Sequence, residues 1–192
     1  MSSSPFIETF TGVRFQPLKP NFADIRIEDI AHALSNQCRF SGHVRHFYGV
    51  AEHSVRVSRL LTGLGAGVEL WGLLHDASEA YLVDLPTPLK SQSTIGDGYR
   101  VAERRLMRAV AKRFGLIGRE PGAVRVADAK LLATEVRDLM FAKPEHWSDG
   151  KLPYPPLGPR IVPWSPKTAE DEFLRRYAEL VPVKQPKTKK TA

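Results

Sequence analysis

Three separate stretches of the chain combine a helical apolar repeat with a histidine or aspartate that is costly to bury without a partner. His53 shares an inward helix face with Val57, and the pair His75-Asp76 follows the apolar stripe of a second stretch. Asp128 lies in a third such stretch. A buried carboxylate must be paired, hydrogen-bonded or bound to a metal. We therefore expect the fold to bring these groups together, as a pocket of two imidazoles and two carboxylates.

The apolar periodicity predicts an all-α fold, a helical bundle with a small N-terminal β-hairpin. The hairpin is expected at residues 8–15 around a Thr-Gly turn, and Asp24 is expected to cap the first helix. Residues 143–166 hold seven of the fifteen prolines and should be irregular, either as a long loop or as an arm between subunits. After a first helix that carries Ile27, Ile30, Ala31 and Leu34, further helices are expected at about 50–61, 68–81, 97–114, 121–141 and 166–180.

Length and composition favour a single domain without disulfides. At 192 residues the chain is long enough for one hydrophobic core, which we expect over residues 1–182. Its one cysteine, Cys38, excludes an internal disulfide and fits a reducing compartment. No apolar run nears the roughly 20 residues of a membrane span. Because no secretory signal is apparent either, we expect a cytoplasmic protein without a membrane partner.

The formal net charge of +7 is concentrated near the C-terminus. Residues 183–192 hold four lysines and should form a basic, disordered tail. Without these four the body carries only +3. We therefore expect a small phosphorylated ligand, and nucleic acid is an unlikely partner.

The four ligand-type residues come from three distant helices, as in metal sites built inside helical bundles. Two imidazoles and two carboxylates suit one divalent transition metal such as Mn, Co, Fe or Zn. The close cysteine pairs of structural zinc sites are absent, which favours a catalytic centre with open positions. The alternative is that His53 is an ordinary core histidine and that Asp128 is exposed.

The order His…His-Asp…Asp resembles the signature of the HD-domain metal-dependent phosphohydrolases. Around it, the chain is similar to bacterial HD-domain 5′-deoxynucleotidases and, in its N-terminal third, to phage dATP triphosphohydrolases. The similarity covers roughly residues 8–140. The segments that carry it are Ile30–His43, Glu52–Ser54, His75–Glu79, Asp84–Lys90 and Ala127–Ala129.

This resemblance implies roles for the residues at matching positions. His53, His75, Asp76 and Asp128 would hold the metal, and Glu79 would act as general acid or polariser, with Asp84 sharing that role or positioning the sugar. Arg39 would clamp phosphate and Phe40, where the deoxynucleotidases have Trp, would contact the nucleotide. His43 and Lys90 would bind substrate as well. Since no histidine lies between His75 and Asp128, one metal is favoured over two.

The resemblance leaves the reaction open between two forms of 5′ phosphoester cleavage. A deoxynucleoside monophosphate would yield phosphate, whereas a dNTP would yield triphosphate and need further cationic groups or additional Mg or Mn. A catalytically silent nucleotide-sensing or partner-binding protein is the alternative to an enzyme. The resemblance also implies a homo-oligomer, a dimer or larger. Trp71 and Trp164 are expected in packing, and Glu135 and Asp138 at the surface or behind the ligands.

Overall fold

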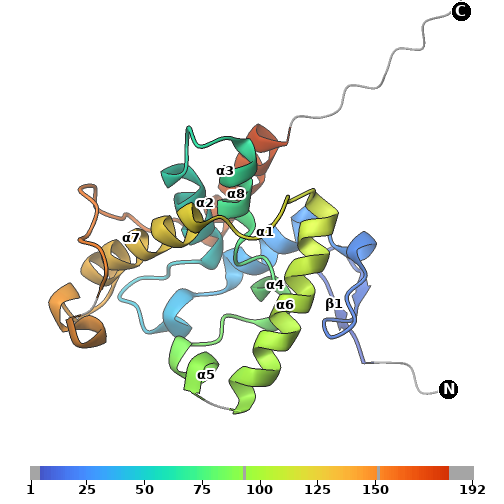
Figure 1. The fold of residues 1–192 in the computed structure, drawn as a ribbon, viewed down its shortest axis with the longest axis horizontal. Helices are drawn as coiled ribbons and strands as arrows, with labels where there is room; N and C mark the ends of the chain where they lie inside the picture. The colour runs from blue at the N-terminus through green and yellow to red at the C-terminus, as the bar shows by residue number, and fades with distance from the viewer. Residues whose placement is uncertain (1–4, 93, 151, 182–192) are drawn as a thin grey trace, which may run out of the picture.

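A computed structural model describes residues 5–92, 94–150 and 152–181 and shows a mostly helical chain (Figure 1). The predicted hairpin is confirmed as β1 (Ile7–Glu8) paired antiparallel with β2 (Arg14–Phe15). The helices are α1 (Ile27–Asn36), α2 (Val50–Leu60), α3 (Ala66–Leu74), α4 (Glu79–Leu82), α5 (Thr87–Gln92), α6 (Thr94–Phe114), α7 (Gly122–Leu139) and α8 (Pro166–Leu180). Short 3₁₀ turns lie at Phe22–Asp24, Arg39–Gly42 and Pro144–Gly150.

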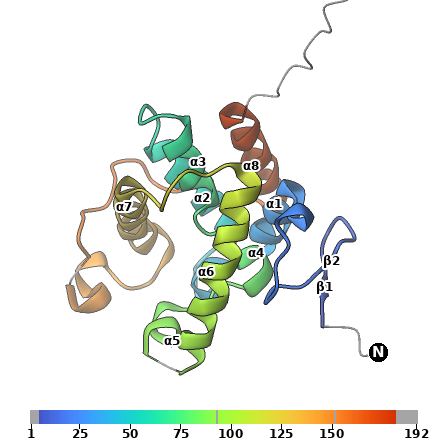
Figure 2. The ribbon, with the colours of Figure 1, turned by 45° about the vertical axis from the view of Figure 1, so that its right-hand side comes forward.

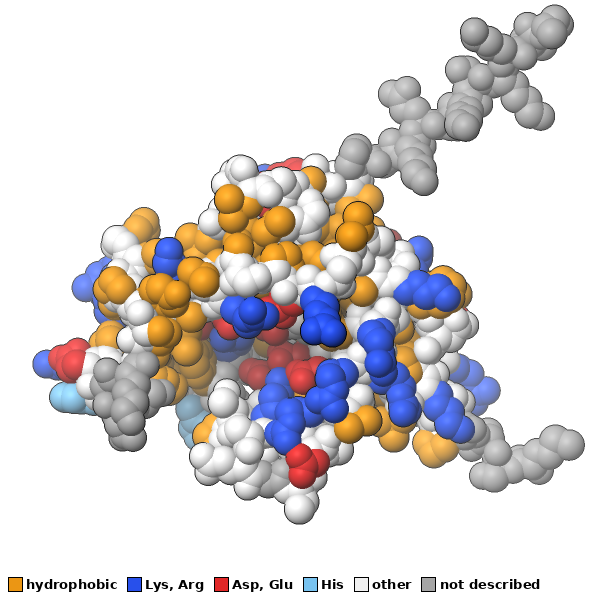
Figure 3. All heavy atoms as spheres, in the orientation of Figure 1, with side chains coloured by type: hydrophobic (Ala, Val, Ile, Leu, Met, Phe, Trp, Pro, Cys, Tyr) orange, Lys and Arg blue, Asp and Glu red, His pale blue; other side chains and the backbone are white. Residues whose placement is uncertain are grey.

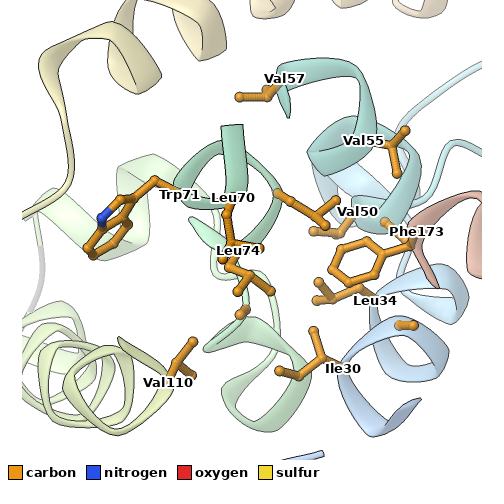
Figure 4. Packing of buried hydrophobic residues seen from close by; sticks show 14 of the residues in the cluster. Ile30, Leu34, Val50, Val55, Val57, Leu70, Trp71, Leu74, Val110 and Phe173 are labelled. Atoms are coloured by element: carbon orange, nitrogen blue, oxygen red, sulfur yellow. The ribbon is translucent and has the colours of Figure 1, made fainter. Parts of the chain in front are cut away.

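The buried core gathers around α2, which packs against α1, α3, α7 and α8 (Figures 1 and 2). Of the predicted inward residues of α1, Ile30, Ala31 and Leu34 are completely buried and Ile27 is partly buried. Figure 4 shows Phe173 of α8 beside Leu34 and Val50, so the last helix closes the core against the first two. Burying a side chain of this size contributes about 1.5–3 kcal/mol. The all-α expectation is therefore confirmed for the described residues.

Helices α2 and α3 approach closely because Gly72 has no side chain. A Cβ at Gly72 would press into the Cδ1 of Leu61 and would lie 3.2 Å from the Cα of Ser58. The hydroxyl of Ser58 donates a hydrogen bond of 2.8 Å to the carbonyl of Glu69, which ties the two helices together. This close contact brings the histidine of α2 within reach of the histidine at the end of α3.

Four details of the expected secondary structure are wrong. Asp24 ends a 3₁₀ turn and does not cap α1, whose N-cap is Arg26 without a side-chain hydrogen bond. The helix expected over 68–81 ends at Leu74, and α4 follows after a turn. The short helix α5 (Thr87–Gln92) forms in the stretch between the helices expected at 68–81 and 97–114, and α6 starts at 94 instead of 97.

The described residues of the proline-rich segment 143–166 form a loop that is hydrogen-bonded to α7 and α2. The backbone N–H of Ile161 donates to Asp138 at 2.8 Å, and that of Trp164 donates to the buried carboxylate of Glu52 at 2.7 Å. Asp138 thus anchors this loop and is not a free surface group. As expected, Trp71 packs in the core, with 7% of its surface exposed.

No helix in the described part of the chain is both long and apolar enough to cross a membrane. The tail expected at residues 183–192 lies outside the described residues.

Candidate metal centre

His53 is held in α2 with its ring completely buried and its Nδ1 lies 2.6 Å from Oε1 of Glu135 on α7. Burial opposes ionisation of Glu135, but Arg39 and His53 outweigh it and lower its pKa to about 2. The ionised carboxylate can only accept a hydrogen bond, so Nδ1 of His53 carries the proton. A neutral His53 ring therefore has its lone pair on Nε2, which points away from Glu135.

His75 lies at the C-terminal end of α3 and is oriented in the same way by the backbone. Its Nδ1 lies 2.8 Å from the carbonyl oxygen of Gly72, which is an acceptor only. The neutral ring therefore has its proton on Nδ1 and its lone pair on Nε2. The two Nε2 atoms of His53 and His75 face each other at 3.3 Å.

The carboxylates of Asp76 and Asp128 lie beside this pair of nitrogens. Nε2 of His53 is 3.3 Å from Oδ1 of Asp128 and 3.7 Å from Oδ2 of Asp76, while Nε2 of His75 is 3.3 Å from the same oxygen of Asp76. Ligands bound at about 2.0–2.2 Å in tetrahedral or octahedral geometry are separated by about 3.0–3.5 Å. Three of these groups, His53, His75 and Asp128, have ligand atoms that all lie within 4.8 Å of one another, so they could hold one metal ion.

The turn after α3 explains how two neighbouring residues reach one site. On a continuous helix, adjacent side chains point about 100° apart. Here Leu74 ends α3, and hydrogen bonds of 3.0 Å from Ala77 N–H to the Leu74 carbonyl and of 2.9 Å from Glu79 N–H to the Asp76 carbonyl form a tighter turn. His75 and Asp76 both lie in this turn, which lets both side chains face His53.

Protonation of the centre follows from these contacts. Burial and the charge of Arg39 lower the pKa of His53, but Glu135 and Asp128 raise it more. The pKa of His53 is therefore raised to about 9 in the protein without a cation. Burial opposes ionisation of Asp128, yet its hydrogen bond to His53 holds its pKa below the ordinary value. A cation that binds Nε2 of His53 must therefore displace a proton.

Arg39 supports the ligands from one side. Its guanidinium lies 3.3 Å from Glu135 and 3.6 Å from Asp76, and only 13% of its side chain is exposed. Burial opposes the charge on Arg39, but Glu135 and Asp76 raise its pKa above the ordinary value. The residue predicted to clamp phosphate thus contacts two carboxylates of the centre.

The next residues form a strained turn. Phe40 and Ser41 have φ values of 54° and 52°, in the left-handed region that side chains other than glycine seldom adopt. Such strain is often found at functional sites. The ring of Phe40 meets Trp147 edge-on at 6.0 Å between centroids. His43, expected to bind substrate, is exposed, and no hydrogen bond joins its side chain to another described residue.

Glu79 and Asp84 lie on the α4 side of the centre. Glu79 is 5% exposed, and its Oε2 is buried without a hydrogen-bond partner among the described residues. Burial and then the charges of Asp76 and Asp84 raise the pKa of Glu79 well above its ordinary value. Burial also raises the pKa of Asp84. Lys90 lies 3.9 Å from Glu79 and is bound at 2.6 Å to Glu103 of α6, so it is neither exposed nor free.

A cleft of about 830 Å³ opens beside the centre, between α3, α6 and α7. Three of the four predicted ligands, His75, Asp76 and Asp128, line it, together with four arginines that the sequence analysis did not single out, Arg104, Arg108, Arg119 and Arg125. Figure 3 shows Lys and Arg side chains around a hollow that has Asp and Glu side chains within it. The volume is in the usual range for a small-molecule site.

The fold and the site define a small helical protein with a candidate metal centre at the base of a cleft. No family model matches the chain. The chain is 38% identical over 177 residues to the uncharacterized protein YfdR of Escherichia coli (strain K12), which covers 91% of this chain and 95% of that protein. It is 39% identical over 155 residues to the uncharacterized protein RCAP_rcc00048 of Rhodobacter capsulatus, over 70% of this chain and 78% of that protein. The chain belongs to the family of YfdR.

Proposed function

We propose that this protein is a metal-dependent phosphohydrolase of the HD-domain type that cleaves the 5′ phosphoester of a (deoxy)nucleotide. The observation that carries the proposal is the geometry of the two histidines. Each Nδ1 is bound to an acceptor, so both Nε2 atoms, which carry the lone pairs of the neutral rings, converge at 3.3 Å beside two carboxylates. Four such groups repel one another unless a proton or a cation lies among them.

The donor set fits a divalent transition metal. His53, His75, Asp76 and Asp128 would hold one Mn, Co, Fe or Zn ion. When bound, the cation supplies Lewis-acid polarisation of the phosphoryl group and activation of a water molecule. A triphosphate substrate could bring additional Mg or Mn with it.

Glu79 would supply the proton in this reaction. The oxygen of water adds to phosphorus and the water releases one proton to the solvent. The bond from phosphorus to the leaving oxygen breaks, and the carboxyl of Glu79 protonates that oxygen and is left as a carboxylate, which takes up a proton again after the products leave. Its raised pKa keeps the proton on at a pH where an exposed glutamate has lost it. The unpartnered Oε2 leaves one oxygen of Glu79 free for this transfer.

The remaining predicted residues would position the substrate and the ligands. Asp84, whose pKa is also raised by burial, would hold a sugar hydroxyl or share the role of acid. Lys90 would hold Glu79 in place from 3.9 Å. Arg39 would orient Asp76 and reach a phosphate with its exposed edge. Phe40, with Trp147 beside it, would form an aromatic wall for the base or sugar, and His43 would approach the substrate from the same turn.

A product assay tests this function. Protein stripped by a chelator and reloaded with Mn²⁺ or Co²⁺ is incubated with dAMP or dATP, and phosphate or triphosphate is identified as the product. We expect turnover only with the cation and none in an Asp76→Ala blank that remains folded. Full activity after stringent chelation would contradict the role of the metal. Nucleotide binding without product under any cation would favour a silent nucleotide-sensing protein instead.

A further inference from the structure

The wall of the cleft carries four arginines from three parts of the chain, Arg104 and Arg108 from α6, Arg119 from the following loop and Arg125 from α7. We refer to them as the arginine rim. Residues four positions apart on a helix lie on the same face. Arg104 and Arg108 therefore both turn toward the cleft and leave Arg105 on another side of α6, where it donates to the carbonyl of Leu18.

Most of the arginine rim has no acidic partner. Among the described residues, two acids other than the predicted metal ligands line the cleft: Glu103 is bound by Lys90 at 2.6 Å, and Glu120 lies 3.8 Å from Arg125. In the described part of the chain, Arg104, Arg108 and Arg119 make no ion pair. Three like charges that converge on one cleft repel one another, so an anion bound between them relieves this repulsion.

The chemistry of the rim suits phosphate oxygens. A guanidinium offers a planar fork of donors that matches a phosphate in two hydrogen bonds. The candidate metal centre needs to bind only the phosphate that is cleaved. Positively charged arginine side chains on a wall of the cleft, in addition to a metal at its base, indicate a ligand with more than one phosphate group.

We infer that the arginine rim is a second anion-binding subsite, which holds the outer phosphates of a nucleoside triphosphate while the first phosphate lies at the metal centre. This inference rests on the proposed function and narrows its substrate from a nucleotide in general to a triphosphate. The bond cleaved is the one already described, between the first phosphorus and the 5′ oxygen, and the products are the nucleoside and triphosphate.

The first experiment measures binding without turnover. Chelator-treated protein is titrated with inorganic triphosphate and with inorganic phosphate by calorimetry, so that the signal reports the arginines and not the metal. We expect triphosphate to bind at least about tenfold tighter than phosphate, because each further hydrogen bond to a charged group contributes to affinity. The double variant Arg104→Gln/Arg108→Gln should lose this difference, and Arg105→Gln, on the same helix outside the cleft, should keep it.

The second experiment measures the ratio of kcat/KM for dATP to that for dAMP with Mn²⁺. We expect the wild-type protein to prefer dATP, and the double variant to lower this ratio by about 10- to 100-fold, mainly through KM for dATP. An unchanged ratio, or equal binding of triphosphate and phosphate to wild type, would overturn the inference. Binding of a single-stranded oligonucleotide that needs the rim, without binding of triphosphate, would overturn it as well and assign the rim to nucleic acid.

The two proposals fail in different ways. If neither nucleotide is hydrolysed but triphosphate binding is lost in the double variant, the proposed reaction is wrong and the subsite stands. If dAMP is hydrolysed and triphosphate does not bind better than phosphate, the reaction stands and the subsite is wrong. Circular dichroism of all variants confirms that each remains folded.

Discussion

Nδ1 of His53 lies 2.6 Å from Oε1 of Glu135, and this contact joins the candidate metal centre on α2 to the second half of α7. Both groups are completely buried. The same carboxylate contacts Arg39 at 3.3 Å, and Arg39 in turn lies 3.6 Å from Asp76. One buried glutamate thereby contacts the candidate ligand His53 directly and is linked through Arg39 to the candidate ligand Asp76.

The first prediction concerns this glutamate. Glu135→Gln keeps the shape but removes the charge that fixes the proton on Nδ1 of His53, so Nε2 loses part of its basicity. We expect affinity for Mn²⁺ or Co²⁺ to fall by about 10- to 100-fold, measured by calorimetry. Asp138→Asn, one turn further along α7 and outside the centre, is the control. Unchanged affinity in Glu135→Gln would show that the contact does not orient the ligand.

The second prediction concerns pH. The pKa of His53 is raised from 6.5 to about 9, so the metal-free ring is mostly protonated at neutral pH. Cation binding should release about one proton per site near pH 7, and affinity should rise until about pH 9 and then level off. Calorimetry in buffers of different ionisation enthalpy measures this proton. Binding without proton release at pH 7 would contradict the assigned protonation of His53.

The raised pKa of His53 also predicts how the free energy of unfolding of the chelated protein varies with pH. Since the folded pKa lies above the ordinary value, the contacts of protonated His53 with Glu135 and Asp128 stabilise the fold fully below pH 6.5. This contribution is lost as pH rises through about 9. Urea unfolding of chelated protein at several pH values should show the midpoint falling over this window. Saturating Mn²⁺ should remove the dependence, because the cation replaces the proton.

The third prediction concerns Glu79. Glu79→Gln cannot donate a proton to the leaving oxygen, and we expect kcat to fall by about 10²- to 10⁴-fold while Mn²⁺ affinity is retained. In the wild-type protein the rate should decline as pH rises through the pKa of Glu79, which burial and Asp76 place well above its ordinary value. Asp84→Asn tests whether the neighbouring acid shares the role. A Glu79→Gln enzyme with wild-type kcat would assign the proton to another group.

The sequence was sufficient to select the four candidate ligand residues, because each lies on or beside an apolar helical stripe. His53, His75, Asp76 and Asp128 were all selected this way, and the structure brings the four side chains together. The turn at His75 was missed since no glycine or proline lies between Leu73 and Leu85 to mark it. The adjacent positions of His75 and Asp76 already indicate a turn, because two neighbouring side chains cannot lie on one face of a regular helix.

The surroundings of the centre were harder to predict, for physical reasons. Glu135 lies two turns beyond Asp128 on the same face of α7. The apolar periodicity alone does not show which of two such carboxylates would bind the metal and which would hold a histidine ligand in place. Arg104 and Arg108 look like any solvated helix face until a loop and α7 fold opposite them. Trp147 belongs to a proline-rich stretch without periodicity, so no sequence pattern could place it beside Phe40.

The last prediction tests the close contact that brings the two histidines together. Gly72→Ala introduces a Cβ that presses on Leu61 and lies 3.2 Å from the Cα of Ser58, so α3 must move away from α2. We expect a loss of about 1–3 kcal/mol in the free energy of unfolding, measured in urea. Because the shift separates the rings of His53 and His75, Mn²⁺ affinity should fall as well.

Gly67→Ala is the matched control for this prediction, since it lies in the same helix and a Cβ there meets nothing within 4 Å. Alanine at an open helical position stabilises by about 0.5–1 kcal/mol, so this variant should unfold at the same or a higher urea concentration and bind Mn²⁺ normally. If Gly72→Ala were as stable as the wild type and bound Mn²⁺ equally well, Leu61 alone would have moved aside. The distance between the two histidines would then be set by the turn after Leu74 and not by the contact between α2 and α3.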